Sequence, residues 1–196
     1  MDSQPLADLV ERLQAVCLES GVVVGTAESC TGGLIAKVIT DLAGSSRFFL
    51  GGVVSYANET KIRLLSVPAE QLAAHGAVSA QVARSMAVGA RNAMGLDYAV
   101  AVTGVAGPSG GGPAKPVGLT YVAVADERGS DVRRFVWSGD RAAIRAETAR
   151  AALEMLIERV SNAGARRVEA PGDSVQSGTP ETSAAEPVSA PAREPG

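Results

Sequence analysis

The sequence predicts one layered α/β domain in which helices cover both faces of a β-sheet. Short apolar runs typical of buried strands alternate with longer segments whose apolar residues recur at helical spacing. The chain of 196 residues is long enough to bury a full core, yet it fits a single domain. Aromatic residues make up only 4% of the chain. The small residues Ala, Gly and Val dominate instead, which suits close packing of helices on a sheet.

The first half of the chain begins with a helix and a strand. Residues 3–20 carry one apolar stripe at helical spacing, and Gly21 follows as a typical helix stop. Residues 22–27 are an apolar run typical of a buried strand. The elements expected next are a helix over 34–42, a strand over 51–57, a short helix over 58–65 and a helix opened by Pro68.

The second half repeats the alternation. Ser79 is a favourable N-cap for the helix that follows it, and Asp140 is expected to cap the last helix. The strands expected between these helices cover residues 98–102, 119–125 and 133–137, the last two paired as a hairpin around 127–130.

The composition changes at about Gly164. Residues 164–196 contain five of the ten prolines and no Leu, Ile, Met or aromatic residue. Such a segment cannot bury enough apolar area to offset its ordering entropy. We therefore expect a folded domain over residues 1–163 and a disordered tail, rich in Pro, Ala and Glu, over 164–196.

Bulk properties argue against several classes of protein. The net charge is −3 with both signs interspersed, which disfavours nucleic-acid binding through a basic face. No stretch of 18 apolar residues is present, and residues 1–14 do not resemble a signal peptide. Cys17 and Cys30 make no disulfide framework, and His75 is the single histidine, so we expect no metal and no cofactor. A cytoplasmic location is expected.

The segment from Glu28 to Gly33 lies where a strand gives way to a helix. Backbone N–H groups of a first helical turn are unpaired and form a natural anion site. Ser29, Cys30 and Thr31 supply nucleophilic or polar side chains there, and the two glycines let a substrate approach the backbone. Spacing alone, however, favours a simple helix cap, because Ser and Thr are common caps.

Seven sequence blocks lie in order over about residues 5–160. The blocks are Thr26–Gly33, Ala43–Ser46, Gly52–Lys61, His75–Ser79, Val102–Pro108, Lys115–Gly118 and Ser138–Arg141. In residues and spacing they resemble the CinA C-terminal domain family, and the tail lies outside them. The stand-alone members of this family are nicotinamide-nucleotide amidohydrolases (NMN deamidases, PncC).

The resemblance implies a serine amidase that uses a lysine as its base. Matched by motif, Ser29 is the nucleophile, Lys61 the general base, Tyr56 lies beside it, and Thr103 is a supporting polar group. The implied reaction hydrolyses the carboxamide of nicotinamide mononucleotide (NMN) to the carboxylate and releases ammonia. A serine needs such a base, and a desolvated lysine can act as one. Taken without the motif, Lys61 would be a solvated surface charge.

Several groups are candidates for binding the substrate. The amides of Thr31, Gly32 and Gly33 are expected to form the oxyanion hole, where one donor is worth about 10²–10³ in rate. Glu28 is expected to hold either Lys61 or this turn in place.

Glycines and arginines are candidates for the ribose-phosphate end. Amides of the loop containing Gly104 and Gly107 are expected to line it, unless that loop is only a flexible connection. Arg141 and Arg145 lie one helical turn apart and suit a phosphate or carboxylate, unless they belong to a solvated helix face.

The resemblance also implies a fold and an assembly. The fold is a three-layer α/β/α sandwich with a mixed sheet, somewhat like anticodon-binding domains, and the assembly is a homodimer or higher homo-oligomer. Two other readings stay open. One is a non-catalytic module that binds a nucleotide or a protein. The other is a hydrolase that acts on a different amide or uses Cys30 as its nucleophile.

Overall fold

The computed structural model describes residues 5–169, and side chains as far as residue 163. Its centre is a five-stranded sheet with the strand order β2-β1-β3-β4-β5. β1 is parallel to both β2 and β3, whereas β4 is antiparallel to β3 and β5, so the sheet is mixed. The strands are β1 (Val24–Glu28), β2 (Phe49–Val54), β3 (Tyr98–Gly104), β4 (Leu119–Asp126) and β5 (Gly129–Val136).

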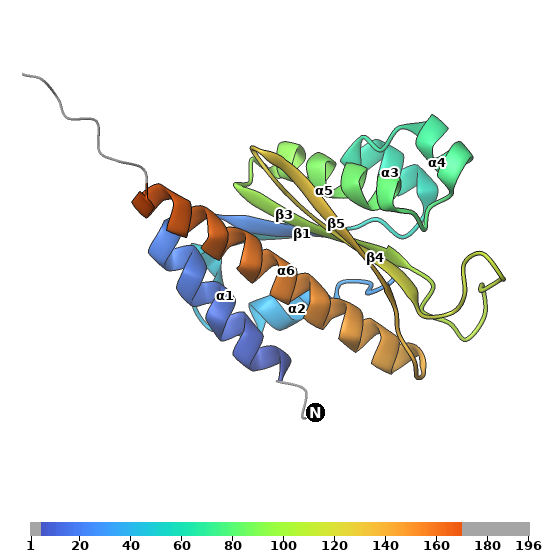
Figure 1. The fold of residues 1–196 in the computed structure, drawn as a ribbon, viewed down its shortest axis with the longest axis horizontal. Helices are drawn as coiled ribbons and strands as arrows, with labels where there is room; N and C mark the ends of the chain where they lie inside the picture. Colours follow the sequence, from blue (N-terminus) through green and yellow to red (C-terminus); the bar gives the residue numbers. More distant parts are fainter. Residues whose placement is uncertain (1–4, 170–196) are drawn as a thin grey trace, which may run out of the picture.

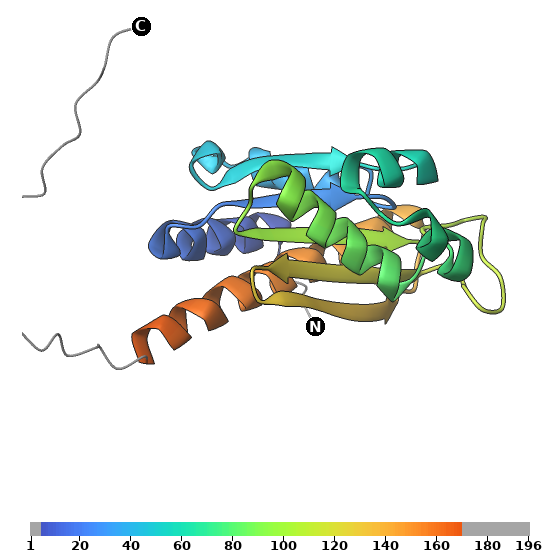
Figure 2. The same cartoon turned by 90° about the horizontal axis from the view of Figure 1, so that it is seen from above.

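Helices cover both faces of this sheet, which confirms the three-layer α/β/α architecture (Figures 1 and 2). One face carries the two long terminal helices and a short one: α1 (Leu6–Ser20), α2 (Leu34–Thr40) and α6 (Arg141–Glu169). The other face carries α3 (Asn58–Leu65), α4 (Ala69–His75) and α5 (Ala80–Met94). A short 3₁₀ turn, η1 (Ser45–Arg47), leads into β2.

The alternation of side chains along β3 explains the two hydrophobic cores. Val100 and Val102 belong to the core shared with α1 and α6, whereas Ala99 and Ala101 belong to the core under α5. Successive strand residues point to opposite faces, so one short strand serves both cores. The alanine face is shallow and lets α5 lie close to the sheet.

Local signals placed most element boundaries well. The Ser79 hydroxyl accepts a hydrogen bond from the Val82 amide, and an Asp140 carboxylate oxygen accepts one from the Ala143 amide, so both predicted caps are confirmed. β2 lies two to three residues earlier than expected and ends at Val54. Residues 55–57 therefore form a connection between β2 and α3, and this connection contributes to the site described below.

The last helix is longer than the sequence suggested. Gly164 was expected to open a disordered tail, but α6 continues to Glu169. A glycine inside a helix costs only about 1 kcal/mol relative to alanine, and the residues after it include the good helix formers Ala165, Arg166 and Arg167. The predicted tail boundary is therefore about six residues early. The rest of that segment, 170–196, lies outside the described residues.

Candidate active site

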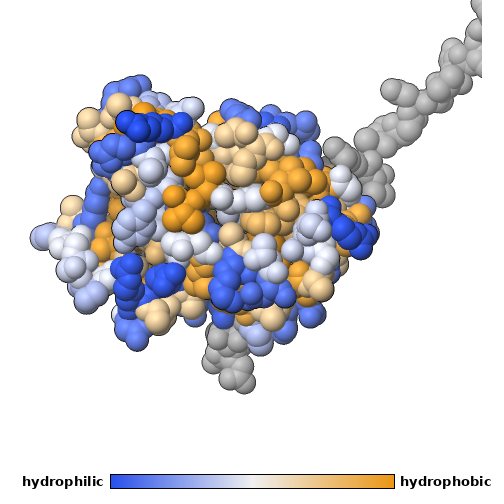
Figure 3. All heavy atoms as spheres, turned by 180° about the vertical axis from the view of Figure 1, so that it is seen from behind, coloured by the Kyte–Doolittle hydropathy of each residue, from blue (hydrophilic) through white to orange (hydrophobic). Residues whose placement is uncertain are grey.

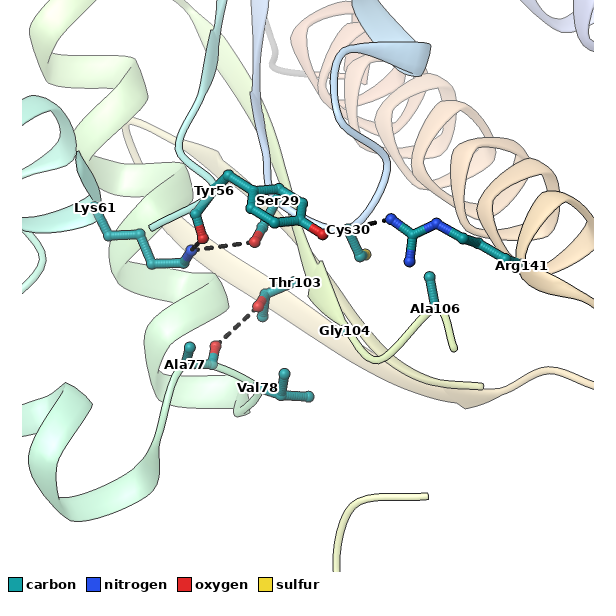
Figure 4. Close-up of a pocket in the computed structure, with 10 residues that line it drawn as sticks. All are labelled: Ser29, Cys30, Tyr56, Lys61, Ala77, Val78, Thr103, Gly104, Ala106 and Arg141. Carbon is teal, nitrogen blue, oxygen red and sulfur yellow. Dashed lines mark hydrogen bonds between the residues drawn. The ribbon is translucent and has the colours of Figure 1, made fainter. Parts of the chain in front are cut away.

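The candidate site lies where three parallel strands end. Because β1, β2 and β3 run in the same direction, their carboxyl ends lie together at one end of the sheet. Such strand ends are a common place for ligand sites in α/β proteins. Ser29 follows β1 directly, Tyr56 follows β2, and Thr103 and Gly104 end β3. A cavity of about 220 Å³ opens between them (Figure 4). Its lining residues are Ser29, Cys30, Tyr56, Lys61, Ala77, Val78, Thr103, Gly104, Ala106 and Arg141.

The chemical centre of this cavity is the contact between Ser29 and Lys61. Lys61 Nζ lies 3.1 Å from Ser29 Oγ, although the two residues are 32 positions apart. The same nitrogen donates to the carbonyl oxygens of Ser55 at 2.6 Å and Tyr56 at 3.2 Å. Lys61 projects from the first turn of α3 and is only 1% exposed. The alternative of a solvated surface lysine is therefore wrong for this position.

Burial sets the protonation of this amine. Removal from water lowers the pKa of Lys61 below its ordinary value, and the nearby Cys30 opposes the shift in part. A neutral amine has two N–H groups and one lone pair. In this neutral form the carbonyls of Ser55 and Tyr56 can accept the two N–H groups, which leaves the lone pair for the Ser29 hydroxyl. The arrangement suits a base that takes the serine proton.

Cys30 lines the same cavity, but its thiol is poorly suited to attack. Burial raises its pKa to about 11; the Glu28 charge adds to the rise, and the backbone N–H groups of Cys30 and Thr31 and the Lys61 amine oppose it. The thiol is thus protonated near neutral pH, whereas the thiolate is the nucleophilic form. This geometry favours Ser29 over Cys30.

The turn after Ser29 is organised by a buried carboxylate. Glu28 is 1% exposed, and one of its oxygens accepts from the Thr31 hydroxyl at 2.7 Å, the Gly33 amide at 2.8 Å and the Ile35 amide at 3.1 Å. The other oxygen accepts from the Ala36 amide at 2.8 Å, and the Thr26 hydroxyl lies 3.4 Å from it. Of the two roles expected for Glu28, the structure places it on the turn and not on Lys61.

These bonds correct the predicted oxyanion hole. The Gly33 amide is taken by Glu28, and the Gly32 amide donates to the Ser29 carbonyl at 3.1 Å. Neither is free for a substrate, because an internal carboxylate and the tight turn satisfy them first. The sequence shows these amide donors but not their acceptors. The direction of the Glu28 side chain could not be predicted, because Glu28 lies just after the predicted strand. The amides of Cys30 and Thr31 interact with the Cys30 sulfur and lower the pKa of its thiol.

The two candidate arginines of α6 have different surroundings. Arg141 lines the cavity; its guanidinium donates to the Gly107 carbonyl at 2.9 Å and lies 3.4 Å from the Tyr56 hydroxyl (Figure 4). Arg145 does not line the cavity. Its guanidinium donates twice to the Thr31 carbonyl, at 3.1 and 2.5 Å, so the predicted substrate contact is replaced by a contact with the turn.

The remaining predicted residues frame the cavity. The Thr103 hydroxyl is buried and donates to the Ala77 carbonyl at 2.8 Å, which joins the end of β3 to the segment before α5. Gly104 lines the cavity, and a side chain there would strike Thr120 and the Leu119 carbonyl. Gly107 contributes its carbonyl to Arg141 rather than an amide to the cavity.

Two features are absent from the described residues. None of the helices there is both long and apolar enough to cross a membrane. Across the same residues, no cluster of three or more His, Cys, Asp or Glu side chains is placed to hold a metal ion.

Comparison with known proteins identifies the family to which the chain is similar. The model of the CinA C-terminal domain matches residues 6–160. A CinA-like protein of Geobacter sulfurreducens is 57% identical over 145 residues, which is 74% of this chain and 35% of that protein. One of Citrifermentans bemidjiense is 54% identical over 149 residues, 76% of this chain and 36% of that protein. The chain thus spans about a third of the length of these relatives.

Solved structures agree in fold and sequence. The competence/damage inducible protein CihA of Agrobacterium tumefaciens is 43% identical, with a TM-score of 0.77 over 81% of this chain and 98% of that one. A CinA superfamily protein of Escherichia coli is 30% identical, with a TM-score of 0.78 over 81% of this chain and 92% of that one. Since the family model spans most of the chain, this chain belongs to the CinA C-terminal domain family.

Proposed function

We propose that the chain is a nicotinamide-nucleotide amidohydrolase that converts the carboxamide of NMN to a carboxylate and releases ammonia. The observation that carries the proposal is the buried pair of Ser29 Oγ and Lys61 Nζ, 3.1 Å apart, with the same nitrogen bonded to the carbonyls of Ser55 and Tyr56. The choice of substrate rests on the family resemblance of the site motifs, and the chemistry rests on this pair.

The reaction follows the logic of a covalent hydrolase. Ser29 Oγ attacks the carboxamide carbon while its proton passes to Lys61 Nζ. The ammonium of Lys61 then returns that proton to the departing nitrogen, the carbon–nitrogen bond breaks, and ammonia leaves an ester on Ser29. Water attacks the ester and gives a proton to Lys61. Lys61 passes that proton to Ser29 Oγ as the ester bond breaks, and the acid released gives up its own proton to become the carboxylate. No step requires a metal or a cofactor.

The mouth of the cavity suits the anionic end of a nucleotide. Arg141 and Tyr56 lie there side by side, and the Tyr56 side chain is largely exposed at 63%. A guanidinium recognises phosphate through paired N–H groups. Ala77, Val78 and Ala106 give the cavity apolar walls, which suit a flat pyridine ring. The carboxamide would then lie next to Ser29 and the phosphate next to Arg141.

The test measures ammonia release from NMN by the wild type, Ser29→Ala and Cys30→Ala. We expect turnover by the wild type, loss of turnover in Ser29→Ala, and turnover retained in Cys30→Ala, because the Cys30 thiol is protonated. Full activity in Ser29→Ala would remove the serine mechanism, and loss in Cys30→Ala alone would point to the thiol. A wild type that binds NMN tightly without releasing ammonia would instead identify a binding module.

A further inference from the structure

Glu28 is the most highly coordinated buried carboxylate near the site, yet it touches neither the cavity nor Lys61. Four strong contacts reach it, from the Thr31 hydroxyl and the amides of Gly33, Ile35 and Ala36. It is also adjacent in sequence to the nucleophile. Its oxygens accept the free amides at the start of α2, the place where a bound anion would otherwise be expected.

The pattern of hydrogen bonds divides the turn amides into two groups. Those of Gly33, Ile35 and Ala36 are taken by Glu28, and that of Gly32 is taken by the Ser29 carbonyl. The Ser29 amide donates to the Val102 carbonyl at 3.1 Å. Among residues 29–33, only the amides of Cys30 and Thr31 have no oxygen acceptor, and both interact with the Cys30 sulfur. Cys30 lines the cavity, whereas Thr31 is fully buried behind it.

We propose that Glu28 is a positioning residue: it fixes the turn so that the Cys30 amide, at the wall of the cavity, remains available to the carbonyl oxygen under attack by Ser29. This deepens the proposed function and rests on it. An oxyanion is stabilised best by donors held in place before the reaction begins. Glu28 supplies that rigidity from inside the fold, and Arg145 holds the Thr31 carbonyl from the other side.

The chemistry of the carboxylate explains why another residue would not replace it. Both oxygens accept, and every close contact is a donor. A glutamine would turn an NH₂ group toward either the Ala36 amide or the Gly33 and Ile35 amides, so two donors would face each other. A buried amide left without its acceptor is costly, and the turn would move to relieve it.

The experiment compares wild type, Glu28→Gln and Asp126→Asn. Asp126 is a matched control: it is 6% exposed, bound by Arg128 and Arg159, and lies at the far end of the sheet, beyond the pairing of Ala125 with the start of β3. Both substitutions disturb a buried carboxylate, but only one touches the nucleophile turn. Circular dichroism and urea unfolding establish the folded fraction of each protein.

The main readout is the rate at which an alkyl fluorophosphonate labels Ser29, followed by intact mass. In this probe reaction Ser29 Oγ displaces fluoride at phosphorus, and its rate depends on the same oxyanion donors. We expect Glu28→Gln to label at least about tenfold more slowly per folded molecule and Asp126→Asn to label at the wild-type rate. With NMN, Glu28→Gln should lower kcat and leave KM nearly unchanged, because the distant phosphate contact is intact.

The outcomes separate this proposal from the proposed function. Wild-type labelling without NMN turnover would reject the substrate, and the labelling comparison would still decide the role of Glu28. Equal labelling of folded Glu28→Gln and wild type would overturn that role, and so would a wild type that neither labels nor turns over. If Glu28→Gln does not fold, Thr31→Val removes one donor to the carboxylate and should slow labelling by a smaller factor, with unchanged labelling again overturning the proposal.

Discussion

Lys61 is held by neutral groups alone. Its contacts are one hydroxyl and two carbonyls, and no carboxylate within the described part of the chain forms an ion pair with it. A buried ammonium without a counter-charge is disfavoured, so burial lowers the pKa of the amine. The sequence could suggest this role only through the motif, because the burial of Lys61 depends on how α3 meets the ends of β1 and β2.

The first prediction follows from that pKa. The protonated amine cannot accept the serine proton, so kcat/KM should rise with pH as Lys61 loses its proton. The midpoint should lie below 10.5, the ordinary value for a lysine. Lys61→Met should abolish ammonia release and keep nucleotide binding, measured by calorimetry. Near-normal turnover in Lys61→Met at neutral pH would remove the base role.

At the scale of elements, α5 packs so closely on the end of α3 that no side chain fits between their backbones at Gly89. A Cβ atom on Gly89 would lie 1.8 Å from the Leu65 carbonyl oxygen at the end of α3. Backbone atoms cannot move aside without moving the helix, and α3 carries Lys61. The position of the Lys61 amine therefore depends on a glycine that lies outside the cavity.

Gly89→Ala is the second prediction. Alanine gains about 1 kcal/mol in helix propensity, but overpacking costs about 1–3 kcal/mol, so the free energy of unfolding should fall or stay level. Because α3 must shift and α3 carries Lys61, kcat per folded molecule should also fall. Urea unfolding and ammonia release measure the two effects. Gly112→Ala is the control, since a Cβ there meets nothing within 4 Å; equal kcat in both variants would contradict the argument.

Prediction from sequence succeeded where a signal is local. The caps at Ser79 and Asp140, the bounds of α3 and the hairpin of β4 and β5 follow from residue type and spacing. The strand order could not be read, because it depends on which distant strands pair with β1. The hydrogen-bond acceptors of the Gly32 and Gly33 amides could not be predicted for a similar reason. Their acceptors depend on the direction of the Glu28 side chain and on the tightness of the turn.

At the scale of the whole molecule, one ionic cluster joins the hairpin to α6. Burial alone would raise the pKa of Asp126, but hydrogen bonds from Arg159 and from the Arg128 amide and guanidinium lower it to about 2. Arg159 also bonds to Asp131 on β5. The folded-state pKa lies below the unfolded value of about 3.9, so this contribution is present above pH 4 and disappears as the pH falls toward 2.

Asp126→Asn should therefore lower the free energy of unfolding at pH 7 by about 2 kcal/mol. The difference from wild type should shrink between pH 4 and pH 2. Urea unfolding at several pH values measures it. Asp131→Asn is the control, because its side chain is 62% exposed and such pairs contribute less than about 1 kcal/mol. A wild-type advantage that did not change with pH would rule out this origin.

The edge of the sheet at β2 is the surface where we propose that a second copy binds. β2 has a strand on only one side, and Leu50 and Val54 on it are 55% and 49% exposed. Apolar side chains gather on this side of the molecule (Figure 3). Leu50→Lys should shift the protein toward monomer in light scattering, whereas Val136→Lys, on the opposite edge strand, should not. An unchanged mass for Leu50→Lys would place the interface elsewhere.

The depth of Lys61 has a consequence for chemical modification. The chain has three lysines, and the other two, Lys37 and Lys115, are respectively exposed on α2 and half-buried in the loop after β3. Reductive methylation of the native protein should modify those two first and Lys61, which is 1% exposed, more slowly. Preparations methylated at both should keep releasing ammonia, and inactivation should follow the slower modification of Lys61.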